Sequence, residues 1–199
     1  KKKIILTGSE GHLGGQFKNF CDRKKLKTVN LQNFKNIPKF KNISSLVHFQ
    51  FYISKKNNNQ LIKKNLDIIR KLCTYCFLNN LKLIFISTCS ADLDINAYTR
   101  SKKNCEKFIY DFYSKNKNFN FNILRLYNVY SSKKNSRGVI PDLIKRFHKK
   151  KNNIKLKNYL NVRDFIHSED VFELIYKTLS SKKNGLYEVG TSKPTSIIK

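Results

Sequence analysis

The sequence of 199 residues lacks any long apolar run. No stretch approaches the roughly 20 apolar residues that a membrane-spanning helix needs. The apolar segment Ile4–Leu6 is too short for the hydrophobic region of a signal peptide. We therefore expect a cytoplasmic protein without a membrane partner, and the 40% hydrophobic content is enough for a globular core.

Acidic residues are scarce, with 13 Asp and Glu against 41 Lys and Arg, so the net charge is +28. This charge has two explanations: a polyanionic partner, or codon bias in an AT-rich genome that favours Lys, Asn and Ile together. The lysines are spread along the whole chain, and the 24 Asn residues bring no charge, which favours bias. The sequence also shows no recognisable basic and aromatic platform for nucleic acid, so we expect no nucleic-acid partner.

The five cysteines are odd in number and irregularly spaced, which argues against a disulfide framework. Cys73 and Cys76 form a C-x-x-C motif, but they lie deep in a helical pattern on the same face as Leu66 and Ile69. A redox or metal role would need a helix N-terminus or a second pair of ligands. We therefore predict core thiols and no metal site.

The N-terminal stretch predicts a nucleotide-binding turn. The apolar run Ile4–Leu6 stops at Thr7, and Gly8, Gly11 and Gly14 follow at three-residue spacing. The next apolar residues share one helical face: Leu13, Phe17, Phe20 and Cys21. This pattern is typical of a strand, a tight turn and a helix, in which glycines let the backbone approach an anion and the helix N-terminus supplies N–H groups. The expected guest is a dinucleotide pyrophosphate.

The rest of the chain alternates between strand and helix patterns. We predict strands at 26–31, 46–51, 81–86, 121–126, 154–160 and 185–189, and helices at 60–79, 97–115, 139–148 and from Ser168 onward. Polar segments at 33–44 and 133–137 are predicted loops. Alternation of this kind indicates an α/β fold with a doubly wound parallel sheet, Rossmann-like, covered on both faces. We expect a dinucleotide-binding domain at 1–130 and, at 131–199, a small incomplete substrate lobe whose elements return to the main sheet.

The acidic residue that usually binds the adenosine ribose is missing. It should follow the second strand, about 20 residues after the glycines, but no Asp or Glu occurs between Asp22 and Asp67. Asn30 is suited to bond a ribose hydroxyl without charge, whereas Lys35 is suited to meet a 2′-phosphate. The choice between NAD and NADP stays open at this point.

Three polar residues beyond the central strand are suited to hydride chemistry. Tyr98 and Lys102 are four residues apart and so share one helical face. A nearby ammonium lowers the pKa of a phenol, which would make Tyr98 a usable proton acceptor near neutrality. The hydroxyl of Thr88 would hold the reacting oxygen, and bound nicotinamide would take or give the hydride.

At this point the chain resembles the NAD-dependent epimerase/dehydratase family of extended short-chain dehydrogenases/reductases. The similar motifs are Thr7–Gly14 (TGxxGxxG), Val47-His48, Asn65, Ile86-Ser87-Thr88, Tyr98–Lys102 (YxxSK), Leu124–Tyr130 (LRxxNVY), Arg163–His167 (RDFIH) and Gly185–Gly190 (GxYxxG). They occur in colinear order over nearly the whole chain.

The resemblance implies a nucleotide-sugar substrate and a tightly held NAD or NADP. It makes Tyr98 the base, Thr88 the group that orients the sugar hydroxyl, and Lys102 a ligand of the nicotinamide ribose. The residues expected at the cofactor are Gly8, Ser9, Gly11, His12, Leu13, Gly14, Asn30, Asn65, Tyr98 and Lys102. Asn128 and Arg163 would face the substrate diphosphate, for which a guanidinium is well suited. A homodimer is left open.

The chain departs from the family pattern at several positions. Gln50 and Phe51 replace small residues and are expected to crowd the cofactor, and only ten positions separate Thr88 from Tyr98. The chain ends at Lys199, where the family usually continues, so we expect either a fragment or an unusually small member. A catalytically weak relative that binds dinucleotide as a sensor or scaffold is therefore the alternative to an active enzyme.

The expected reaction is hydride transfer without loss of water. In the family's dehydratases an Asp-Glu pair follows the catalytic Thr, whereas Cys89-Ser90 follows Thr88 here. The nearest carboxylates are Asp92 and Asp94. A serine hydroxyl does not remove a carbon-bound proton near pH 7 without an activating base. The sequence therefore favours 4-epimerisation through a transient ketone, or reduction of a keto sugar.

Overall fold

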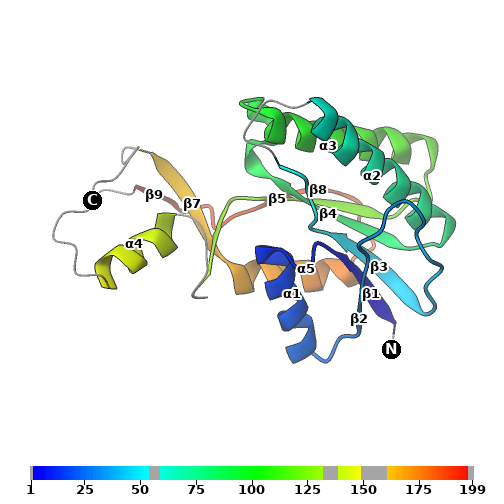
Figure 1. Cartoon of the computed structure of the whole chain (residues 1–199), viewed down its shortest axis with the longest axis horizontal. Helices are drawn as coiled ribbons and strands as arrows, with labels where there is room; N and C mark the ends of the chain where they lie inside the picture. Colours follow the sequence, from blue (N-terminus) through cyan, green and yellow to red (C-terminus); the bar gives the residue numbers. More distant parts are fainter. Residues whose placement is uncertain (1, 54–58, 132–138, 149–160, 197–199) are drawn as a thin grey trace.

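A computed structural model of the chain describes residues 2–53, 59–131, 139–148 and 161–196. Its centre is a six-stranded sheet in the order β2-β1-β3-β4-β5-β8 (Figure 1). The strands are β1 (Lys3–Thr7), β2 (Thr28–Asn30), β3 (Ile43–His48), β4 (Lys82–Thr88), β5 (Phe121–Leu126) and β8 (Gly185–Val189). Every neighbouring pair is parallel, so the carboxyl ends of all six strands lie at one edge.

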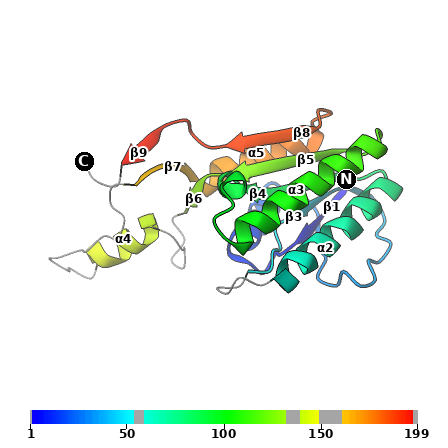
Figure 2. The same ribbon diagram turned by 90° about the horizontal axis from the view of Figure 1, so that it is seen from above.

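Four helices cover the two faces of this sheet. On one face lie α1 (His12–Arg23) and α5 (Ser168–Ser180), and on the other α2 (Asn59–Leu78) and α3 (Ala97–Lys115) (Figures 1 and 2). Alternate residues of β1 enter the two cores, because successive side chains of a strand point to opposite faces. Ile5 packs with the α2 and α3 side, whereas Ile4 and Leu6 pack with the α1 and α5 side. The chain therefore has the predicted doubly wound, Rossmann-like α/β fold.

A second, three-stranded sheet projects from the carboxyl edge of the first (Figure 2). It consists of β6 (Asn128–Tyr130), β7 (Val162–His167) and β9 (Pro194–Ser196) in the order β6-β7-β9. The pair β6-β7 is parallel and the pair β7-β9 is antiparallel. Helix α4 (Val139–His148) lies beyond it, with Pro141 in its first turn as predicted. The chain returns from this region to the main sheet through α5 and β8.

The topological switch point lies between β1 and β3. From β1 the chain goes to β2 on one side, and the next strand, β3, pairs with β1 on the other side. Ligands of open parallel sheets bind at the carboxyl ends of the strands on either side of such a point. The predicted loop 33–44 is confirmed up to residue 42, because β3 already begins at Ile43. Residues 31–42 contain no helix or strand, and they pack against the α2 face through Phe34, Ile37 and Phe40.

Several predicted boundaries need correction. The apolar pattern 46–51 predicted a strand through Phe51, but β3 ends at His48 because the backbone after it turns toward the site, where Phe51 packs on Phe85 and Tyr98. The cap of α5 is His167, whose Nδ1 accepts a hydrogen bond from the Glu169 N–H, rather than Ser168. The short strands β6, β7 and β9 were not predicted. The predicted loop 133–137 and strand 154–160 lie outside the described residues.

Two further features concern the described part of the chain. Cys73 and Cys76 are completely buried free thiols whose pKa is raised by burial, as expected of core residues. Within the described ranges no helix has both the length and the apolar character to cross a bilayer. The same residues bring together no group of His, Cys, Asp and Glu suited to a metal ion.

Candidate active site

The glycine turn joins β1 to α1 at the switch point. Gly8 has a φ of +70°, and a Cβ there would lie 2.6 Å from the backbone nitrogen of Gln50. A Cβ at Gly14 would lie 2.2 Å from the carbonyl oxygen of Gly8. Only glycine satisfies these two positions, because the backbone of the turn, the helix and the segment after β3 meet there.

Gly11 has a different surrounding. It is the N-cap of α1 and provides no side-chain cap, and its own N–H donates to the Gly8 carbonyl at 2.9 Å. A Cβ at Gly11 would come within 3.1 Å of the Gly8 oxygen. The N-cap residue therefore places no side chain over the first turn of α1. This turn also contains no acidic residue. A helix N-terminus presented in this way fits an anionic pyrophosphate.

Two adjoining cavities form what we call the glycine trench. Both are lined by Gly8, Gly11, Phe49 and Phe51. The first cavity, of about 260 Å³, continues to Thr88, Tyr98, Lys102 and Tyr127, and the second, of about 400 Å³, continues to Ser9, Glu10 and Gln32. The trench therefore leads from the end of β4 and the start of α3, across the glycine turn, to the end of β2. This path suits an extended ligand with a pyrophosphate at its middle.

Most of the predicted site residues line this trench. Those on its walls are Gly8, Ser9, Gly11, His12, Leu13, Gly14, Thr88, Tyr98 and Lys102. Four predicted residues lie elsewhere: Asn30, Asn65, Asn128 and Arg163. Sequence reasoning gave no role to Phe49 and Tyr127, which are walls of the trench because they directly follow β3 and β5.

Asn65 is buried at the base of the segment after β3. Its side-chain oxygen accepts from the Tyr52 N–H at 3.0 Å, and its amide nitrogen donates to the Tyr52 carbonyl at 3.0 Å and to Ser101 Oγ at 3.2 Å. Asn65 therefore holds residues 51–53 against α3. A role at the cofactor, which stays a prediction, would act through this segment.

The remaining three residues are spread over both sheets. Asn30 is exposed at the end of β2. Asn128 Nδ2 donates to the Asp164 carbonyl at 3.3 Å, and exposed Arg163 on β7 bonds the Val162 carbonyl at 3.3 Å. Asn128 and Arg163 thus belong to neighbouring strands of the second sheet, on the side beyond Tyr127. Their assignment to a substrate diphosphate stays a prediction.

Lys102 is covered by an aromatic ring. Only 3% of Lys102 is exposed, and its ammonium donates to the Ile86 carbonyl at 2.6 Å. The Phe51 ring lies over the same ammonium, 3.7 Å from Nζ to the ring centroid, and packs edge-on against Tyr98 at 5.6 Å. Burial lowers the pKa of Lys102 to about 7. Phe51 therefore fills space beside Lys102 and Tyr98 in the trench, and its crowding of a bound cofactor stays a prediction.

The expected lowering of the Tyr98 pKa is wrong for this structure. Burial raises the pKa of Tyr98, and nearby Cys89 raises it further. The Lys102 ammonium is engaged by Ile86 and Phe51 and lies 5.8 Å from the centroid of the Tyr98 ring. Tyr98 therefore keeps its proton at neutral pH.

A buried ion pair supports the end of β4. Ser87 Oγ bonds the Glu106 carboxylate, which pairs with Arg125 of β5 at 2.6 Å. Arg125 also reaches Asp92 in the 3-10 helix η1 (Cys89–Leu93), and this contact lowers the pKa of Asp92. Sequence reasoning missed this cluster, although an arginine inside an otherwise apolar strand is a signal that a buried acidic partner exists. The cluster fixes the strand end that carries Thr88.

The chain belongs to the NAD dependent epimerase/dehydratase family, whose sequence model matches residues 23–190. The glycine turn precedes the matched range. The fold and the trench are typical of α/β dinucleotide-binding domains, and the family match identifies the family within this class. No curated protein sequence matches the chain.

Solved structures share this fold over almost the whole chain. A UDP-N-acetylglucosamine 4-epimerase from Methanobrevibacter ruminantium in complex with UDP-N-acetylmuramic acid has a TM-score of 0.82 at 18% identity, covering 99% of this chain and 79% of that one. A UDP-glucose 4-epimerase from Thermotoga maritima with UDP-glucose has a TM-score of 0.80 at 16% identity, covering 98% and 79%. A dTDP-glucose 4,6-dehydratase from Bacillus anthracis in complex with NAD has a TM-score of 0.76 at 17% identity, covering 100% and 78%.

Proposed function

We propose that this chain is an NAD(P)-dependent epimerase or reductase that acts on a nucleotide sugar by Tyr98-assisted hydride transfer. The observation that carries the proposal is the shared trench. It brings the N-terminus of α1 together with Thr88, Tyr98 and Lys102 in a chain of the epimerase/dehydratase family. Solved structures with the same fold include two 4-epimerases in complex with UDP-linked compounds, which supports a nucleotide sugar as substrate.

Each residue has a distinct role in the proposal. The first turn of α1 binds the pyrophosphate of the cofactor, with Gly8, Gly11 and Gly14 allowing its close approach. Thr88 orients the reacting sugar oxygen, and Tyr98 exchanges a proton with it. The nicotinamide, when bound, accepts and donates the hydride. Asn128 and Arg163 contact the substrate diphosphate.

The protonation states favour the reductive half of such a reaction in the ligand-free site. Tyr98 retains its proton because burial raises its pKa, so it is ready to protonate the oxygen of a carbonyl group whose carbon receives a hydride. The reverse direction needs the phenolate, which a closer Lys102 ammonium would stabilise. The Lys102 ammonium would approach the Tyr98 oxygen if the Phe51 ring, which now lies over the ammonium, moved away.

Loss of water is not part of the proposal. The carboxylates nearest to Thr88 are already paired, Asp92 with Arg125 at 2.5 Å and Asp94 with Arg100 at 3.1 Å. Neither carboxylate lines the trench, and Cys89-Ser90 supply no second acid and base. The contact with Arg125 lowers the pKa of Asp92, which makes this carboxylate a poor proton acceptor.

The test is turnover of nucleotide hexoses and keto sugars with NAD or NADP, followed by mass spectrometry of the product. We expect Tyr98→Phe to lower turnover by at least about 100-fold, the lower end for a positioned acid or base, while dinucleotide binding persists by calorimetry. Lys102→Ala should weaken both. Full activity of Tyr98→Phe would contradict the mechanism, and a product lighter by one water would identify a dehydratase.

A second candidate function follows from the covered Lys102. A chain that binds dinucleotide as a sensor or scaffold has no need of an accessible ammonium beside the tyrosine. The contact of Phe51 with Lys102 and the raised pKa of Tyr98 favour this alternative. Dinucleotide binding without conversion of any nucleotide sugar, in the parent protein, would select it.

A further inference from the structure

The end of β4 is held by side chains from one face of α3. Tyr98, Lys102 and Glu106 lie four residues apart along this helix and therefore share that face. The Lys102 ammonium donates to the Ile86 carbonyl at 2.6 Å, and the Glu106 carboxylate accepts a hydrogen bond from Ser87 Oγ. These two contacts near the carboxyl end of β4 determine how the strand lies along α3, the helix that carries Tyr98.

Arg125 of β5 connects the same carboxylate to the segment after β4. Its Nη2 donates to the Glu106 carboxylate at 2.6 Å, and its Nε donates to both carboxylate oxygens at 3.2 Å. Its Nη1 donates to Asp92 in η1 at 2.5 Å and to Glu188 on β8 at 3.4 Å. Because a guanidinium is planar and rigid, contacts from all three nitrogens fix the partners relative to one another.

Thr88 lies between the two positions that this cluster holds. Ser87 comes directly before it, and Asp92 lies in η1, for which Thr88 is the N-cap. Thr88 Oγ1 accepts a hydrogen bond from the Ser90 N–H at 3.4 Å, which turns the hydroxyl hydrogen away from η1. The direction of this hydroxyl in the trench therefore depends on where Ser87 and η1 are held.

The buried ion pair supplies geometry rather than stability. The side chains of Glu106 and Arg125 are 5% and 12% exposed, so both charges have lost most of their contact with water. This loss offsets the attraction between them, and a well-packed apolar pair would stabilise the fold about as well. An apolar pair would, however, form no directed bonds to Ser87 and Asp92.

We propose that Glu106 and Arg125 are positioning residues for the Thr88 hydroxyl. They hold it where it reaches the same sugar oxygen as the Tyr98 hydroxyl. This inference rests on the proposed function, in which Thr88 orients that oxygen and Tyr98 exchanges a proton with it. The two hydroxyls belong to different elements, β4 and α3, and Glu106 joins those elements directly. Neither Glu106 nor Arg125 lines the trench, so both act through Thr88.

The test is the turnover of Glu106→Gln, counted per dinucleotide site that calorimetry finds, so that unfolded protein does not imitate the effect. Glutamine keeps an acceptor for Ser87 but loses the charge that binds Arg125. We expect kcat to fall by about 10- to 100-fold, as for a displacement of about 1 Å. KM and the dinucleotide affinity should stay within about twofold of the parent, because the lost geometry matters in the transition state. Ser87→Ala, which leaves the ion pair intact, should lower kcat in the same way but by less.

A double-mutant cycle with Thr88→Val separates positioning from a general structural role. Valine keeps the shape of threonine but removes the hydroxyl that the cluster holds. In this background Glu106→Gln should change kcat by no more than about twofold, because the two substitutions remove the same interaction. A loss as large as in the parent background would overturn the positioning role.

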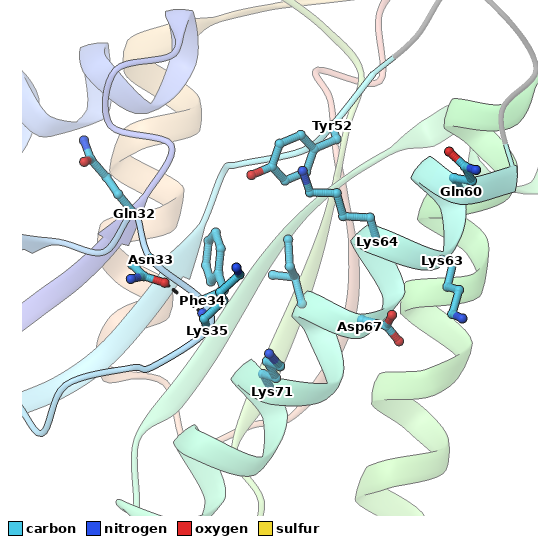
Figure 3. Close-up of a pocket in the computed structure, with 11 residues that line it drawn as sticks. Gln32, Asn33, Phe34, Lys35, Tyr52, Gln60, Lys63, Lys64, Asp67 and Lys71 are labelled. Carbon is cyan, nitrogen blue, oxygen red and sulfur yellow. Dashed lines mark hydrogen bonds between the residues drawn. The ribbon is translucent and has the colours of Figure 1, made fainter.

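Two matched controls remove a carboxylate that pairs with an exposed arginine. Glu169→Gln breaks the pair with Arg23 at 2.6 Å, and Asp67→Asn breaks the pair with Arg70 at 3.0 Å. Asp67 lines another cavity, of about 770 Å³, between α2 and the segment after β2 (Figure 3). Neither carboxylate lines the trench, so both variants should keep kcat within about twofold of the parent.

Crystal structures of the parent and of Glu106→Gln distinguish failure of this inference from failure of the proposed function. We expect η1 and Thr88 to move by about 1 Å relative to Tyr98, with the glycine turn unchanged. If the parent converts no nucleotide sugar, the proposed function fails, and an unmoved Thr88 then overturns the positioning role as well. If the parent is active and Glu106→Gln keeps its kcat, the positioning role is wrong and the proposed function stands.

Discussion

At the scale of residues, Phe51 controls access to Lys102, which the proposed function places at the nicotinamide end of the trench. The ring covers the Lys102 ammonium at 3.7 Å and touches Tyr98, so it occupies space that a ligand of Lys102 needs. A contact of this kind between a cation and an aromatic ring is worth about 0.5 to 2 kcal/mol. In the proposed function, a cofactor that binds at Lys102 has to displace the Phe51 ring.

We predict that Phe51→Ala raises the affinity for the dinucleotide by about 2- to 30-fold, the equivalent of the lost cation–π contact. Titration calorimetry measures the change. The control is Phe49→Ala, which also enlarges the trench but whose ring packs on Phe17 at 5.4 Å. A weaker affinity in Phe51→Ala than in the parent would instead make the ring part of the cofactor site.

At the scale of elements, the proposed cofactor binding depends on the N-terminus of α1. Its first turn has no acidic residue and no side chain at the cap, so the positive end of the helix dipole faces the trench. The position where a charge can be added with the least backbone conflict is Gly11, whose Cβ would approach only the Gly8 oxygen, at 3.1 Å.

We predict that Gly11→Asp abolishes dinucleotide binding, because the carboxylate would occupy and repel the place of the pyrophosphate. Aspartate is also a favourable N-cap, so the fold should be retained, as circular dichroism and thermal unfolding would show. Gly11→Asn is the matched control of similar size without the charge, and it should lose less affinity. Unchanged dinucleotide affinity in Gly11→Asp would show that the cofactor does not bind at this turn.

The elements show which features the sequence could predict. Helix α3 at Ala97–Lys115 and strand β5 at Phe121–Leu126 were predicted at their observed bounds, because local capping and periodicity determine them. The end of β3 was missed because Phe49–Phe51 continue the apolar pattern, while tertiary packing takes them out of the sheet. The pKa of Tyr98 was missed for a similar reason: helical spacing places Lys102 on the same face but does not reveal that Phe51 and Ile86 engage its ammonium.

At the scale of the whole molecule, buried basic groups couple folding to pH. His48 is 2% exposed beneath the glycine turn, where its Nδ1 bonds the Thr7 hydroxyl at 2.7 Å. Burial, with the nearby Lys102 charge, lowers the pKa of His48 to about 3. The unfolded chain therefore binds a proton at His48 that the folded chain rejects, from about pH 6.5 downward.

We predict that the free energy of unfolding falls as pH is lowered from 7 toward 5, by up to about 1.4 kcal/mol per pH unit below about 6.5 from this one group. The stabilisation is complete above the unfolded pKa and is lost progressively toward the folded pKa near 3. Urea unfolding at several pH values between 7.5 and 5 measures the slope.

The substitution His48→Asn isolates this effect, because it keeps a hydrogen-bond acceptor near the Thr7 hydroxyl but removes the titrating ring. Its slope below pH 6.5 should be shallower than that of the parent, whereas His148→Asn, at an exposed position on α4, should leave the slope unchanged.

Other titrating groups contribute little to this slope. Lys102 has a pKa of about 7 in the folded chain and about 10.5 when unfolded, so it lowers the free energy of unfolding mainly as pH falls from about 10.5 to 7. Carboxylates titrate mostly below pH 5 and also fall outside this window. A parent slope that His48→Asn does not change would mean that His48 accepts its proton in the folded chain, with the Thr7 contact broken.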